Sequence, residues 1–229
     1  MYIQGLIERA NKGSVDAQYE VAKLYFSGDG VEKDIDLAIK WFSMAAMNGH
    51  GRANFELGKL HYNANKRDKA KPYLEFAANQ DIVEASYLLG NINSFSYSDY
   101  DKAIHYYRLA ANKGHCESKY KLGCRIIGIR YCNVDDNLIK ELRNKIPKGE
   151  EYKWIEAAAD QGHPDAIHDI GSEYLLTTHP PYPDEKVQKA LNLLIKESNK
   201  GSANAKLIIG RYAEFVVGGS EGRKLAEKF

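Results

Sequence analysis

The sequence repeats itself along most of its length, and this internal repeat constrains the fold more than any other feature. Residues 17–49 open with a small residue, place Ala22 five positions later, and close with an aromatic residue, an Ala-Ala pair and Gly49. Copies of the opening, with glycine in the place of Ala22, occur at residues 53–58, 85–90, 118–123, 166–171 and 205–210. Copies of the closing end at residues 81, 114 and 162, with a weaker one at 201. Two apolar patterns of 3.6-residue period per unit predict stacked helix–turn–helix repeats.

Each recurring residue type has a physical role in such a unit. Glycine inside the first helix (helix A) costs about 1 kcal/mol relative to alanine, so it indicates close contact with a neighbouring helix. The Ala-Ala pair of the second helix (helix B) allows the same approach, and the aromatic residue before it supplies apolar area between the helix layers. Asp34 or Asp36 can cap the first helix B. The glycines that fit the C′ position after helix B are Gly49, Gly114, Gly162 and Gly201.

On these residues the chain resembles the Sel-one-like repeat (SLR) family, a branch of the tetratricopeptide-like solenoids. Residues 17–49 follow the pattern A-x-x-x-L-G-x-x-Y-x-x-G-x-G-V-x-x-D-x-x-K-A-x-x-W-Y-x-x-A-A-x-x-G, with Ala22 in the first glycine position and Leu37-Ala38 for K-A. The G-x-G-V turn is missing from the second and third copies. The resemblance implies an all-α, right-handed α/α superhelical solenoid of about five to six repeats.

The repeats divide the chain without suggesting a second domain. We expect a single SLR domain over residues 1–229, with an N-terminal capping helix at 1–12 and a C-terminal partial repeat or cap at 202–229. The repeats between them span 13–49, 50–81, 82–114, 115–162 and 163–201. Residues 129–149 and 177–185 are insertions, and 129–149 contains a short amphipathic helix pattern. Insertions in a solenoid form loops on one face, so they either bind a partner or are merely tolerated.

Composition excludes several classes of partner. The 32 basic and 31 acidic residues nearly cancel, giving a net charge of +1, whereas a nucleic-acid-binding surface is normally basic. Mean hydropathy is −0.52 and no long apolar run is present, so we expect no membrane span. The N-terminal residues lack the pattern of a secretory signal, and we therefore expect a cytoplasmic protein.

Few residues are arranged for chemistry. Cys116, Cys124 and Cys132 are eight residues apart, and eight residues of one helix rise about 12 Å, too far for a disulfide. The local group that could hold a metal is His163, Asp165, His168 and Asp169, but its spacing matches no named zinc pattern. No nucleophile, base and oxyanion donor are combined. We expect no enzymatic activity, no cofactor and no metal.

The remaining possibility is recognition of a protein by the helix A face, which lines the concave groove of such solenoids. The positions three before the repeat glycine, one after it and four after it form a stripe of aromatic and cationic side chains. Tyr and Arg are enriched at binding hot spots. Alternatively, the aromatic residues of the stripe pack between adjacent A helices. The candidate partner-binding residues are Tyr19, Lys23, Phe26, Phe55, Lys59, Tyr62, Tyr87, Asn91, Tyr120, His168 and Arg211.

The resemblance implies a non-enzymatic module of the adaptor or scaffold type that binds a partner protein. Stand-alone bacterial relatives resemble immunity proteins that neutralise a toxin, and this is the alternative hypothesis. An enzyme with an unrecognised site in the groove is a third and weaker one. No nucleic acid, membrane or small-molecule cofactor is expected as a partner.

Overall fold

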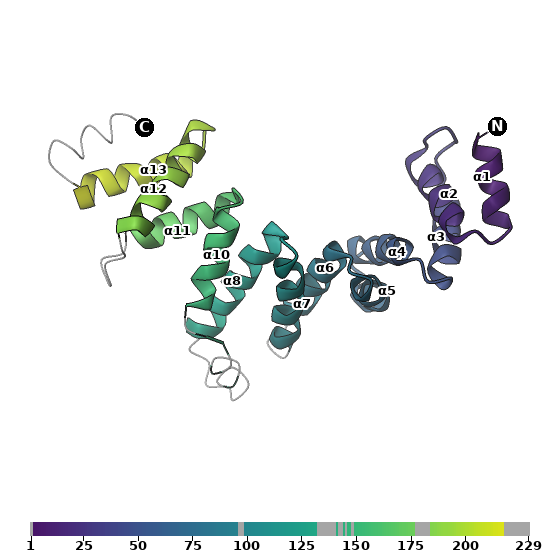
Figure 1. Cartoon of the computed structure of the whole chain (residues 1–229), viewed down its shortest axis with the longest axis horizontal. Helices are drawn as coiled ribbons and strands as arrows, with labels where there is room; N and C mark the ends of the chain where they lie inside the picture. Colours follow the sequence, from purple (N-terminus) through teal and green to yellow (C-terminus); the bar gives the residue numbers. More distant parts are fainter. Residues whose placement is uncertain are drawn as a thin grey trace. The chain divides into compact units, whose positions relative to one another are not determined.

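The computed structural model of the chain is helical throughout the part that it describes. Described are residues 2–95, 99–131, 141, 144, 146–147, 149–176 and 184–217. These residues form twelve α-helices and one π-helical turn, and they contain no strand (Figure 1). The chain divides into two compact units, Met1–Lys113 and Gly114–Phe229. The all-α helical-repeat solenoid expected from the sequence is confirmed.

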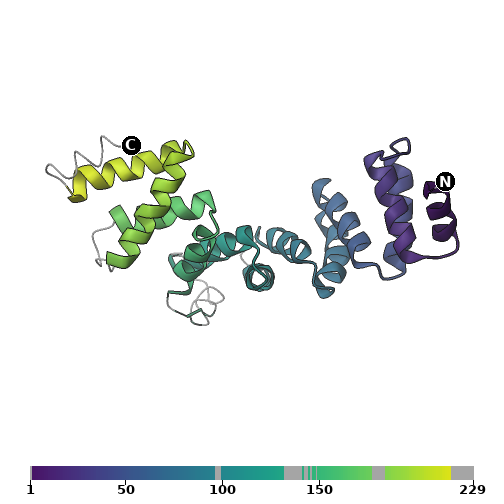
Figure 2. The same ribbon diagram turned by 45° about the horizontal axis from the view of Figure 1, so that its top comes forward.

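The first unit contains three consecutive A–B hairpins preceded by a single helix B. Each helix packs against the next one along the chain, and α4 also contacts α6. The A helices are α2 (Val15–Ser27), α4 (Gly51–Asn63) and α6 (Val83–Asn93). The B helices are α1 (Tyr2–Asn11), α3 (Ile35–Met47), α5 (Arg67–Asn79) and α7 (Tyr100–Asn112), and Figure 2 shows these hairpins from a second direction.

The second unit continues the same alternation. Its A helices are α8 (Cys116–Tyr131), α11 (Pro164–Leu176) and α13 (Ala203–Tyr212), and α13 runs into a π-helical turn, Ala213–Val217. Its B helices are α10 (Glu150–Ala159) and α12 (Asp184–Asn199). The short helix expected within 129–149 and the loop at 177–183 lie outside the described residues, apart from isolated positions.

The repeat glycines of the A helices mark the closest helix crossings. A Cβ atom added at Gly58 would lie 2.7 Å from the Leu74 side chain, and one at Gly90 would lie 2.5 Å from the Tyr107 ring. A Cβ at Gly171 would lie 2.7 Å from Leu194. Contacts under 3 Å cannot be accommodated without a shift, so glycine is needed where these helices cross.

The deepest core position is the residue that follows the recurring aromatic of helix B. Trp41 is only half-buried, whereas its neighbour Phe42 is 1% exposed. The same holds at the equivalent positions of the other repeats, which are Leu74, Tyr107, Ile155 and Leu194, all at most 1% exposed. The conspicuous aromatic therefore covers the edge of each layer, and the residue after it fills the interior.

The predicted helix ends are confirmed. Asp34 caps α3, because its Oδ1 accepts from the Leu37 backbone N–H at 2.9 Å. The four predicted C′ glycines all have positive φ, between 82° and 97°. In the second repeat Asp81 occupies this place with φ of 65°, a conformation that costs an ordinary side chain more than glycine.

Candidate functional site

On α2, the candidate residues are divided between the core and the surface. Tyr19 is buried at 9% exposed, and its ring is stacked on His50 at 4.4 Å between centroids and tilted against Phe42 at 5.8 Å. Phe26 is half-buried and meets Phe42 edge-on at 6.2 Å. Lys23 is exposed, with its ammonium 5.5 Å from the centre of the Tyr19 ring. At Tyr19 the aromatic position therefore serves packing, and Lys23 is the accessible group.

On α4 the same arrangement returns with a more accessible ring. Phe55 is half-buried, and the exposed Lys59 places its ammonium 5.7 Å from the ring centre. Tyr62, one turn further along the helix, is half-buried against the core of the next hairpin. A cation over an aromatic face is a favourable contact at a protein surface. Because the pair Tyr19–Lys23 recurs as Phe55–Lys59, the two helices present equivalent aromatic–ammonium pairs.

On α6 the candidates are tied into the fold. The Tyr87 ring is tilted against Tyr107 of α7 at 6.4 Å. Asn91 Oδ1 accepts a hydrogen bond from the Tyr107 hydroxyl at 2.8 Å. Both Tyr87 and Asn91 are half-buried, so part of each side chain remains available at the surface.

A cleft of about 760 Å³ lies beside these residues, between the N-terminal ends of α4 and α6. Its walls include the rings of Tyr19, His50 and Phe55 and the aliphatic side chains of Ile82 and Val83. Its charged lining residues are Arg52, Glu56, Asp81 and Glu84. The lining of the cleft is therefore mixed, with aromatic rings and aliphatic side chains beside charged and amide groups.

Two residues in the lining of this cleft are joined by a hydrogen bond. Gln80 Nε2 donates to the Gly49 carbonyl at 3.0 Å, which links the end of one helix B to the end of the preceding one. Gln161, at the equivalent position of the second unit, donates to the Gly114 carbonyl at 3.2 Å. The residue before the C′ position therefore connects successive repeats, a role that the sequence did not suggest.

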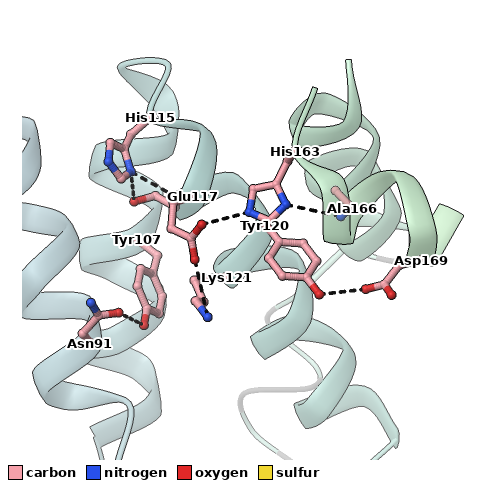
Figure 3. Close-up of polar contacts among 10 residues, drawn as sticks. Asn91, Tyr107, His115, Glu117, Tyr120, Lys121, His163, Ala166 and Asp169 are labelled. Carbon is pink, nitrogen blue, oxygen red and sulfur yellow. Dashed lines mark hydrogen bonds and ion pairs between the residues drawn. The ribbon is translucent and has the colours of Figure 1, made fainter. Parts of the chain in front are cut away.

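In the second unit, Tyr120 belongs to a polar cluster between α8 and α11 (Figure 3). Its ring lies 4.4 Å from His163, and its hydroxyl donates to Asp169 Oδ2 at 3.0 Å. His163 Nε2 lies 2.9 Å from Glu117 Oε2. Burial raises the pKa of Tyr120, and the negative charge of Asp169 acts in the same direction. The Tyr120 hydroxyl therefore remains protonated and is a structural donor.

Glu117 is the charged centre of this cluster. Burial acts to raise its pKa, but the hydrogen bond and charge of His163, together with Lys121, lower it below its ordinary value. Glu117 therefore stays ionised and holds the His163 ring. The other candidates of this unit are more exposed: His168 is half-exposed with Nδ1 3.3 Å from Asp169 Oδ1, and Arg211 is exposed on α13.

The histidines after the repeat glycines are N-caps. His50 Nδ1 accepts from the Ala53 N–H at 3.1 Å, His115 Nδ1 from the Ser118 N–H at 3.1 Å, and His163 Nδ1 from the Ala166 N–H at 3.3 Å. Ser202 performs the same function for α13 through its hydroxyl. The position of these histidines directly before each helix A was the signal for a cap.

The described residues contain no group of three or more His, Cys, Asp or Glu side chains arranged to hold a metal ion. His163 is instead engaged by Glu117 and Ala166, and Asp169 by Tyr120. Cys116 and Cys124 are thiols without a disulfide, and Cys132 lies outside the described residues. Within the described ranges, no helix combines the length and apolarity that crossing a bilayer requires.

Stacked A–B hairpins, joined through glycines and alanines and displaying side chains along their A helices, define an α/α repeat solenoid. Residues 15–50, 83–115 and 152–163 match the Sel1 repeat family. The chain has the fold of a Sel1 repeat protein from Oxalobacter formigenes, with a TM-score of 0.65 at 21% identity over 94% of this chain and 84% of that one. These matches and the shared fold support a solenoid built of Sel1-like repeats (SLR), and repeats of this kind are protein-interaction modules.

Two curated relatives are much longer than this chain. A putative sel1-like repeat-containing protein of Acanthamoeba polyphaga mimivirus is 28% identical over 129 residues, which are 56% of this chain and 24% of the relative. An Arabidopsis thaliana protein, described as the ERAD-associated E3 ubiquitin-protein ligase component HRD3B, is 35% identical over 88 residues. Those residues are 36% of this chain and 13% of that protein.

Proposed function

We propose that the chain is a non-enzymatic adaptor that binds a partner protein, and that the A-helix face of its first unit makes the contact. This binding face is defined by Lys23, Phe55, Lys59, Tyr62 and Asn91 together with the cleft beside α4. The observation that carries the proposal is the cleft of about 760 Å³ next to an accessible aromatic–ammonium pair. Hot spots combine such aromatic area with directed polar contacts.

The chemistry of the face supports a protein partner over a small substrate. Its cleft is lined by charges of both signs, among them Arg52 and Glu56 of α4 and Glu84 of α6. Neither Glu56 nor Glu84 forms an ion pair within the part of the chain that is described. Groups of both signs suit the rim of a protein interface, where they set orientation and register more than affinity.

The description of one curated relative supports the general part of the proposal, that the chain binds another protein. The Arabidopsis relative is described as a component of a ubiquitin-protein ligase, and is thus one part of a larger assembly. We extend to this chain the general role of holding a protein partner. We propose that it does so in the cytoplasm, without a cofactor and without contacting nucleic acid or membrane.

The test begins with identification of the partner by affinity capture from the organism that encodes the chain. The purified partner is then titrated by calorimetry against the wild-type chain and against the double variant Phe55→Ala, Lys59→Glu. We expect the double variant to bind at least about tenfold more weakly, since an anchor and its cation are lost together.

A matched control comes from the B helices. The double variant Phe76→Ala, Lys40→Glu makes the same two changes at exposed positions of α5 and α3. Affinity should remain at the wild-type level in this control, with circular dichroism unchanged in both variants. If the control variant bound more weakly and the Phe55→Ala, Lys59→Glu variant bound normally, the partner-binding site would lie on the B helices instead. An assay of the partner's own activity then separates an adaptor from an inhibitor.

A further inference from the structure

Each unit contains a joint between two successive A helices, in which a histidine caps the later helix and packs on a tyrosine of the earlier one. The two joints differ in how closely an acidic residue approaches the histidine. In the first, the His50 ring caps α4, stacks on Tyr19 of α2, and directs Nε2 toward Asp16 at 3.7 Å. In the second, His163 caps α11, packs on Tyr120 of α8 at 4.4 Å, and places Nε2 2.9 Å from Glu117. In each case the acidic residue stands three positions before the tyrosine.

Capping requires the neutral form of the histidine. Nδ1 of His50 accepts the Ala53 N–H, so the ring proton is on Nε2. Protonation places a second proton on Nδ1, which then faces another donor. Ala53 is 0% exposed, and its N–H has no replacement partner from solvent. The positive end of the α4 helix dipole also opposes a charged ring at this position.

At His50, the surrounding charges do little to stabilise the protonated ring and so to offset the loss of the cap on Ala53. Asp16 is 91% exposed, so water screens its charge, and the 3.7 Å separation exceeds a hydrogen bond. The other groups that act on the ring are Glu20 of α2, which favours its charged form, and Arg52 of α4, which opposes it. Glu56 of α4, with Asp81 and Glu84 before and within α6, line the same cleft. Burial outweighs Asp16 and lowers the pKa of His50.

The acidic partner is closer and less exposed at His163. Glu117 is 37% exposed on its side chain and lies 2.9 Å from Nε2 of the ring. Lys121, 3.5 Å from the second Glu117 oxygen, holds the carboxylate in place.

We infer that the His50 joint is an acid-sensitive lock between α2 and α4, which opens when His50 gains a proton. The lock concerns the fold of the chain and does not depend on the proposed function. Opening of the lock changes the walls of the cleft, because His50 and Tyr19 are both part of its lining.

The experiment measures amide hydrogen exchange of the full chain by NMR at about pH 7.5 and about pH 5.5, corrected for the intrinsic pH dependence. Protection of the Ala53 amide should fall by about fivefold on acidification, the factor that corresponds to loss of one N-cap. Protection of the Ala205 amide, which is capped by the Ser202 hydroxyl and not by a histidine, should stay constant. Equal protection of Ala53 at both pH values would overturn the inference.

The control variant replaces the titrating cap by a cap that does not titrate. His50→Ser reproduces the cap that Ser202 provides for α13 in this same chain, so it should keep Ala53 protected at both pH values. His50→Asn is a second variant of the same kind. If either one shows the acid-induced loss seen in the wild type, His50 is not the responsible group and the lock does not exist.

Discussion

The hydroxyl of Tyr107 donates a hydrogen bond to Asn91 Oδ1 at 2.8 Å and joins α7 to the helix A that precedes it. Tyr107 is 1% exposed, and its ring fills the space that Gly90 leaves open. A candidate binding residue, Asn91, is thus held in place by the core. This coupling means that variants on the proposed binding face must be separated into those that change the surface and those that loosen the hairpin.

The Tyr107–Asn91 bond should have a measurable effect on stability. Tyr107→Phe removes the hydroxyl and leaves the ring, and we expect a loss of about 1 kcal/mol, the net value of one hydrogen bond. Urea unfolding followed through Trp41 fluorescence, in a Trp154→Phe background, reports on the first unit. Tyr107→Ala removes the ring too and should cost about 3–5 kcal/mol. A loss of that size in Tyr107→Phe would show that the hydroxyl does more than bond Asn91.

The repeat glycines should respond differently to alanine. Gly90→Ala places a Cβ 2.5 Å from the Tyr107 ring and should destabilise the chain by about 1–3 kcal/mol through overpacking. A Cβ at Gly210, in the same repeat position of α13, meets nothing within 4 Å among the described residues. Gly210→Ala should therefore be neutral or stabilise α13 by up to about 1 kcal/mol.

Thermal unfolding of both glycine variants tests this contrast directly. If Gly210→Ala is as harmful as Gly90→Ala, the glycine position has a requirement other than the helix crossing. The structure predicts the harm only where a second helix lies against the glycine.

The stability of the second unit should fall in acid because of Glu156. Burial acts to raise the pKa of Glu156, but the Lys186 ammonium at 2.6 Å and the Tyr174 hydroxyl lower it below its ordinary value. A carboxyl with a lowered folded pKa stabilises the fold above its unfolded pKa and loses that contribution as pH falls through the folded value. We therefore expect a loss below about pH 4.5.

Glu156→Gln should reduce this loss of stability in acid. The midpoint of urea unfolding, followed by Trp154 fluorescence in a Trp41→Phe background, measures it as a function of pH. Glu185→Gln, an exposed position of α12, is the matched control and should leave the loss as it is in the wild type. An unchanged pH profile in Glu156→Gln would assign the acid sensitivity to another carboxyl.

The thiol of Cys124 should react slowly in the folded chain. Burial raises its pKa, although the hydrogen bond with Tyr120 acts in the opposite direction. In a chain carrying Cys116→Ser and Cys132→Ser, alkylation by iodoacetamide at about pH 8 should be at least about tenfold slower than that of glutathione. Urea should abolish the difference. Rapid alkylation of the folded chain would mean that Cys124 is exposed and ionised.

The sequence by itself determined the local structure of this protein. Glycines, Ala-Ala pairs and apolar periodicity predicted each described hairpin, and Asp34 and Gly49 marked helix ends, because caps and crossings depend on residues close together in the chain. Only the tertiary structure decided which stripe residues are accessible. Tyr19 is buried because it meets His50, 31 positions later, and Phe55 has no histidine at the matching place. Such contacts depend on the stacking of successive repeats, which no local pattern encodes.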